Sequence, residues 1–180
     1  NEIFGAQERL YQLEYNIFEK IRKKAASYSA QLQQIANIIA IIDCLCSLAM
    51  AALHYNYCQP HFNKEGLIKI KQGRHPVVEQ VLQAERFIPN DLEMNNKKKI
   101  HIITGPNMAG KSTYCRRIAL IVILAQMGSF VPVEQAELPV IHRVFARVGA
   151  MDDVSAGKST FMVEMREIAD ILQSAQENSL

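Results

Sequence analysis

The chain has 180 residues, an apolar share of 49%, a charged share of 21% and a net charge of +2. These values are typical of a globular protein and exclude a mainly disordered chain, and the near-neutral charge gives no argument for a nucleic-acid-binding surface. The four cysteines lack the paired spacing of a zinc site; they are Cys44, Cys46, Cys58 and Cys115.

A long helical segment is predicted over residues 7–57, which contain neither glycine nor proline. Its apolar residues recur at steps of three and four, as on one face of a helix. They are Leu10, Leu13, Ile17, Ile21, Ala25, Tyr28, Leu32, Ile35, Ile39 and Ile42. We expect an interruption at Ala26–Ser29, giving two helices. Two arrangements stay open: a helical hairpin beside an α/β domain, or a long arm.

Residues 35–53 are apolar enough to be mistaken for a membrane span. Asp43 lies at the centre of this segment, and a carboxylate at the middle of a bilayer costs about 2.5–3.5 kcal/mol. We therefore predict a helix buried in protein and no membrane contact. Residues 1–9 have no basic start leading into an apolar core, so no signal peptide is expected.

Gln59-Pro60 is predicted to end the helices. Residues 67–71 alternate apolar and charged side chains and are expected to form an edge strand, followed by a short apolar piece at 77–82. Arg74 and His75 resemble catalytic residues, but a histidine beside proline in a glycine-flanked turn is more often structural.

Residues 87–91 are predicted to form a loop and residues 95–99 a turn. We interpret the three consecutive lysines at 97–99 as the solvated entrance of a strand. A phosphate or nucleic-acid patch is the weaker alternative, because three charges do not make a footprint.

The apolar run Ile100–Ile103 is predicted to be that strand, and it leads into a glycine-rich loop and a helix. Residues 105–112 fit the phosphate-loop pattern G-x-x-x-x-G-K-[ST] at every fixed position. Gly105 and Gly110 let the backbone curl so that N–H groups converge on phosphate oxygens at the positive end of the helix dipole. Lys111 would reach the β- and γ-phosphates, and Ser112 would bind Mg²⁺.

The helix after the loop is predicted over residues 113–127, with apolar Ile118, Ile121, Val122 and Ala125 and with a C-terminal cap at Gly128. A second core strand is expected at 140–148 because β-branched residues are frequent there. A small, polar loop follows at 149–160. Apolar residues then recur at helical spacing in 161–175, after Ser159 and Thr160 at the capping position.

Four of these segments together resemble the MutS family of DNA mismatch-repair ATPases: residues 73–79, 104–113, 128–132 and 152–165. The similarity runs from the helical segment to the last residue. It implies an α/β fold of the P-loop, ABC-type ATPase class, incomplete here, preceded by a long helical lever. The corresponding domains are residues 1–58 for the lever and 59–180 for the N-terminal part of the ATPase domain, truncated before the Walker B segment.

The resemblance also assigns site residues. The nucleotide, ATP or ADP with Mg²⁺, would be bound by Gly105, Pro106, Asn107, Met108, Ala109, Gly110, Lys111, Ser112 and Thr113. Phe87 and Ile88 resemble the pair that stacks on adenine. Ser159, with Thr160, is similar to the signature loop that approaches the γ-phosphate held by a second subunit. Ala109 stands where many members have glycine, and its methyl group is tolerable only if φ is negative.

The family's Asp-Glu pair, the Walker B acids that hold Mg²⁺ through water, is absent from these residues. We therefore expect the 180 residues to be a fragment that binds nucleotide weakly and hydrolyses it negligibly. The complete protein would be an ATPase that recognises mispaired double-stranded DNA and becomes a sliding clamp on binding ATP. It would act as a homodimer or a MutS-type heterodimer, recruit a MutL-type protein, and reside in the bacterial cytoplasm at the nucleoid, or in the nucleus if eukaryotic.

Two other functions stay open. One is a MutS-like ATPase of recombination or anti-recombination, whose substrate is a DNA junction. The other is a structural, chromosome-associated ATPase with long coiled coils, for which the N-terminal helix would be the arm. The latter leaves the Gly73-Arg74-His75-Pro76 element unexplained.

Overall fold

The computed structural model describes residues 2–82, 87–147 and 160–180. Contacts between residues divide the chain into two compact units, Asn1–Ser47 and Leu48–Leu180, and each unit is described by itself. The second unit contains the sheet and the glycine-rich loop. The expected domain boundary between residues 58 and 59 stays a prediction.

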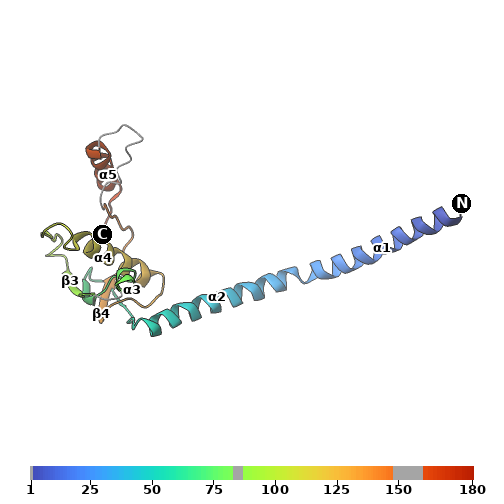
Figure 1. Cartoon of the computed structure of the whole chain (residues 1–180), viewed down its shortest axis with the longest axis horizontal. Helices are drawn as coiled ribbons and strands as arrows, with labels where there is room; N and C mark the ends of the chain where they lie inside the picture. Colours follow the sequence, from blue (N-terminus) through green and yellow to red (C-terminus); the bar gives the residue numbers. More distant parts are fainter. Residues whose placement is uncertain (1, 83–86, 148–159) are drawn as a thin grey trace. The chain divides into compact units, whose positions relative to one another are not determined.

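The first unit contains two helices, α1 (Glu2–Ser27) and the first part of α2 (Ser29–His54). They are separated at Tyr28, whose N–H donates to the Ala25 carbonyl at 3.1 Å, while the Ser27 hydroxyl donates to the Lys24 carbonyl at 2.7 Å. The predicted interruption is confirmed. Within this unit the helices follow one another end to end (Figure 1), so the described residues form no hairpin.

The apolar residues of α2 are exposed, although the sequence predicted a buried helix. Ile35, Ile39 and Ile42 each expose more than half of their surface, and Ala52, close to the end of the helix, is the buried residue of α2. The prediction was wrong because apolar composition shows that a helix can be buried, not that an element covers it. By length and composition alone, α2 is also the one described helix that could cross a membrane.

The second unit is built on a mixed, four-stranded sheet. The strand order is β1 (His61–Asn63), β4 (Gln135–Pro139), β2 (Ile68–Gly73) and β3 (Asn90–Met94). Two of its strands, β3 and β4, are labelled in Figure 1. β1 and β4 are parallel, and β2 is antiparallel to both of its neighbours. The predicted α/β class is confirmed. The predicted edge position of β2 is wrong, because β2 lies between two paired strands.

Helix α4 (Lys111–Gln126) forms the main core with the sheet. Ile118, Ile121, Val122 and Ala125 are all buried, as their helical spacing predicts. They join apolar side chains from three strands and the adjoining segments: Ile68, Ile70, Leu92, Val131, Val133, Ala136, Leu138 and Ile141. Gly128 forms the predicted C-terminal cap just after the end of α4, with a φ of +85°. The N–H of the next residue, Ser129, donates to the Leu124 carbonyl at 3.1 Å.

The two core strands predicted at residues 100–103 and 140–148 do not form in the described residues. Residues 100–103 are neither helix nor strand, and Ile100 and Ile102 expose 85% and 87% of their surface. Residues 140–147 form no strand beyond one bridge between Arg143 and Ser179. The predictions failed because a strand needs backbone pairing along its length. Residues 100–103 have no paired strand among the described residues, and the backbone of residues 142–145 bonds there only to the short segment 178–180.

Two further helices, a turn and a loop belong to the second unit. The apolar piece after Pro76 forms the single-turn helix α3 (Val78–Val81), and the helix predicted over 161–175 is α5 (Thr160–Ser174). The predicted turn at 95–99 is confirmed, since Asn95 and Lys98 exchange backbone hydrogen bonds of 3.0 and 3.2 Å. The predicted loop at 87–91 is confirmed only in part, because β3 begins at Asn90.

Candidate functional site

The glycine-rich loop adopts the curled backbone that its glycines predict. Gly105 and Gly110 have φ values of +153° and +83°, in the region that favours glycine, and Met108 joins them at +66°. A side chain at Gly105 would meet the Ala109 Cβ at 3.7 Å. Ala109 itself keeps a negative φ, so its methyl group fits the loop without backbone strain.

The loop ends on an uncapped helix start. Gly110 is the N-cap of α4, in a left-handed conformation, and no side chain hydrogen-bonds to the first turn. The first N–H groups of a helix have no partner within the helix and form the positive end of its dipole. The Lys111 ammonium lies over the same loop, donating to the carbonyls of Gly105 at 2.7 Å and Pro106 at 2.6 Å. This arrangement is suited to an anion.

A cavity of about 610 Å³ lies beside this helix start. It brings together seven of the predicted site residues, which come from two separate stretches of the sequence: Phe87, Ile88, Met108, Ala109, Gly110, Lys111 and Thr113. Phe87 is partly buried and Ile88 is exposed. The remaining predicted loop residues, Gly105, Pro106, Asn107 and Ser112, do not line the cavity. Their roles, like those of the lining residues, stay predictions.

Other lining residues were missed from the sequence, among them Asn90, Tyr114 and Arg117. The Tyr114 hydroxyl donates to the Asp91 carbonyl at 3.0 Å and ties α4 to β3. The signal was present in the helical spacing. Tyr114 and Arg117 each stand four residues before a core isoleucine of α4, on its buried face.

The Gly73-Arg74-His75-Pro76 segment has a structural role, and none of its residues lines the candidate cavity. Arg74 donates to the carbonyls of Tyr55 at 3.0 Å and Asn56 at 2.9 Å, just after α2, and pairs with Glu79 at 3.1 Å. The buried His75 accepts the backbone N–H groups that begin α3 through its Nδ1 atom, each at 3.3 Å. The structural interpretation of His75 is confirmed.

This contact makes the stability of the chain depend on pH. Burial lowers the pKa of the His75 imidazole, with a smaller contribution from the charges of Arg116 and Arg117. The folded state therefore favours the neutral form of His75. Its contribution to the free energy of unfolding is complete above the unfolded pKa of about 6.5 and is lost as the pH falls toward the lower folded pKa. His75→Asn keeps an acceptor at the same position and removes the titration.

Urea unfolding between pH 7.5 and 5 should therefore show a steeper loss of stability for the native chain than for His75→Asn. The difference between the two proteins isolates His75 from the other titrating groups. Equal pH dependence of the two proteins would contradict the assignment.

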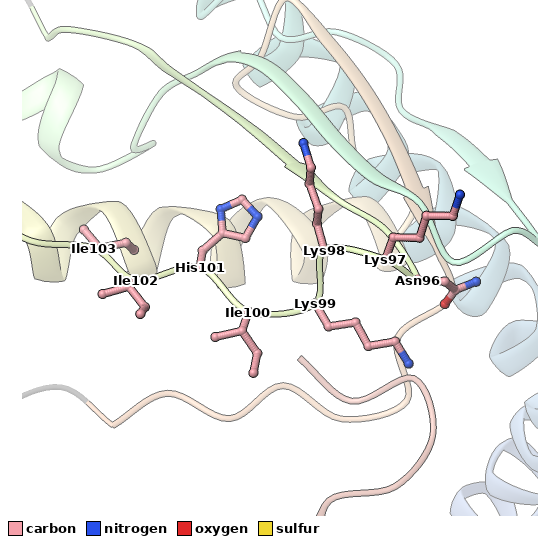
Figure 2. Close-up of a pocket in the computed structure, with 8 residues that line it drawn as sticks. All are labelled: Asn96, Lys97, Lys98, Lys99, Ile100, His101, Ile102 and Ile103. Carbon is pink, nitrogen blue, oxygen red and sulfur yellow. The ribbon is translucent and has the colours of Figure 1, made fainter.

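A second cavity, of about 660 Å³, is lined by residues 96–103. Figure 2 shows Ile100 and Ile102 on one side of the extended backbone and His101 on the other, while Lys97, Lys98 and Lys99 point in different directions. Because the three ammonium groups diverge, they do not form one anion site. The arrangement favours the interpretation of these lysines as solvated, and the cavity beside α4 is the candidate site.

Most of the expected signature loop lies outside the residues that the structure describes. Ser159 lies outside the described residues; Thr160 is the first residue of α5, and its side chain lies outside them as well. No cluster of three or more metal-binding side chains occurs in the described part of the chain.

The fold and the site define a class: an α/β protein with a glycine-rich loop of phosphate-binding spacing at the start of a helix. Residues 101–180 match the family model for MutS domain V. The DNA mismatch repair protein MutS of Syntrophomonas wolfei is 51% identical over 180 residues, which is 99% of this chain and 21% of the relative. That of Caldicellulosiruptor saccharolyticus is 51% identical over 181 residues, covering 100% and 21%.

The chain belongs to the MutS family, and the resemblance stated from its motifs is confirmed. It spans about a fifth of the length of these curated relatives.

Proposed function

We propose that this chain is the nucleotide-binding part of a DNA mismatch-repair protein and that it takes ATP or ADP with Mg²⁺ in the cavity beside α4. The observation that carries the proposal is the meeting of Phe87 and Ile88 with the glycine-rich loop in one cavity. An aromatic ring beside a phosphate-type loop offers both surfaces that a nucleotide needs, a stacking face for the base and N–H groups for the phosphates. We further propose that the second unit has the fold of a P-loop ATPase domain of the ABC type.

Each loop residue has a chemical role in this proposal. Lys111 has three N–H donors, and two of them now bond to loop carbonyls. A triphosphate would supply stronger, charged acceptors for the same ammonium group at the β- and γ-positions. Ser112 is exposed at the second position of α4, and its hydroxyl would bind Mg²⁺. The N–H groups of the first turn of α4 would hold phosphate oxygens.

The complete protein would hydrolyse ATP and use its binding to convert a mismatch-bound dimer into a sliding clamp that recruits a MutL-type partner. The name of the relatives, DNA mismatch repair protein MutS, supports the role in mismatch repair. The ATP cycle, the sliding clamp and the MutL-type partner are what the family resemblance implies. The exposed apolar residues of α1 and α2, which include Leu13, Ile17 and Ile39, support a lever helix that contacts further protein. We place this protein in the cytoplasm at the nucleoid of a bacterium.

A calorimetric titration of the chain with ADP and Mg²⁺ tests the proposal. We expect saturable binding of one ADP, weaker binding of adenosine because it lacks phosphates, and no appreciable ATP turnover. Quenching of a fluorescent adenine nucleotide would give an independent affinity. Absence of ADP binding at millimolar concentration would overturn the proposed site, and turnover comparable to that of complete ATPases would overturn the expectation of an inactive piece.

A further inference from the structure

Arg117 is a buried arginine in the wall of the candidate nucleotide cavity. It lies on the core face of α4, exposes 1% of its surface and lines the cavity together with Lys111 and Phe87. Its guanidinium carbon lies 4.4 Å from the centre of the Tyr114 ring, and its Nη1 atom donates to the Gly73 carbonyl at 2.9 Å. These contacts fix the position of the guanidinium group.

The other edge of the guanidinium has no partner. Nε and Nη2 are both shielded from solvent, and neither makes a hydrogen bond with the described part of the chain. These two nitrogens form one planar fork, which is the geometry that binds two oxygens of a phosphate or carboxylate side by side. A buried charge with unused donors is unfavourable until an anion pairs with it.

We propose that this fork is a phosphate-binding element of the cavity that receives a pair of oxygens from the bound nucleotide. The inference rests on the proposed function and adds a residue outside the loop to it. The fork lies shielded in the wall, so nucleotide entry must shift that wall locally to reach it.

Two features favour phosphate over the base as the partner of Arg117. Long side chains on a helix lean toward its N-terminus, so the guanidinium is carried from residue 117 toward the loop and Lys111. The fork presents two donors and needs two acceptors, whereas the edge of adenine that carries its amino group offers a donor beside an acceptor. A purely structural role for Arg117, linking α4 to β2 through the hydrogen bond to Gly73, would use Nη1 alone. Such a role does not explain the unused Nε and Nη2 donors.

The experiment compares Arg117→Met and Arg117→Lys with the unmodified chain, using ADP, pyrophosphate and adenosine as probes. Arg116→Met is the matched control, because Arg116 is the exposed neighbour on the same helix. We expect Arg117→Met to lower the affinity for ADP and pyrophosphate about 10- to 100-fold and to leave adenosine binding unchanged. Its melting temperature should change little, because the loss of the Gly73 hydrogen bond and the Tyr114 contact is offset by the removal of a buried, half-paired charge. Arg117→Lys keeps the charge without the fork, and its affinity for ADP should be at least about threefold lower than that of the unmodified chain.

Each outcome decides. Unchanged ADP affinity in a folded Arg117→Met protein would overturn the inference and leave the proposed function standing. An equal loss for adenosine and ADP would assign the fork to the base and overturn the phosphate assignment. If Arg117→Met does not fold, Arg117→Lys decides by the same measurements, with unchanged affinity overturning the inference. If the unmodified chain binds no ADP, the inference falls together with the proposed function.

Discussion

Lys111→Met is expected to lower the affinity of the chain for ADP about 100-fold, corresponding to roughly 3 kcal/mol of lost charge-assisted hydrogen bonding. The ammonium already lies over the loop, 2.6–2.7 Å from two of its carbonyl oxygens, so its charge is available where phosphates would enter. Methionine keeps much of the length and apolar stem of lysine and removes the charge. The affinity of the native chain should also fall with added salt, and that of the variant less steeply.

Lys98→Met is the matched control for this experiment. Lys98 is an exposed lysine of the Asn95–Lys98 turn and does not line the candidate site. The Lys98→Met substitution removes the same charge from the chain as Lys111→Met. A purely long-range electrostatic effect on ADP affinity would therefore appear in both variants. ADP affinity of Lys111→Met within threefold of the native value would be incompatible with a phosphate site at this loop.

Ile121→Ala is expected to destabilise the second unit by about 2–5 kcal/mol, because it removes a fully buried side chain and leaves a cavity. Ile121 exposes 0% of its surface at the centre of α4, between the helix and the sheet. Since whole domains are stable by only about 5–15 kcal/mol, this change takes a large part of the total. Urea unfolding followed by circular dichroism would measure it.

Ile123→Ala provides the comparison for the stability experiment. Ile123 belongs to the same helix and exposes 43% of its surface, so its loss should cost about 1 kcal/mol or less. A similar cost for both variants would contradict the core described here. The Lys111 and Ile121 experiments are complementary. Lys111→Met should lower ADP affinity with little effect on the free energy of unfolding, whereas Ile121→Ala should lower both ADP affinity and the free energy of unfolding.

Part of this molecule could be predicted from local sequence alone. Gly105 and Gly110 take positive φ values, α4 buries the face that its spacing marks, and Gly128 ends it. These features depend on the conformational preferences of single residues and on hydrogen bonds within a few residues, so the chain near each position is sufficient. The helical spacing of α4 also puts Arg117 on its buried face, but the sequence-based predictions missed this residue, and only the structure shows what surrounds it.

The tertiary structure decided everything that depends on a distant partner. Ile100–Ile103 has the composition of a strand and forms none, whereas β2 pairs on both sides although its alternating pattern suggested an edge. α2 is apolar and nevertheless exposed. Phe87 meets the glycine-rich loop only through the packing of the second unit. Sequence determined the loop and its helix because their hydrogen bonds are local; pairing and burial depend on which segments meet in space.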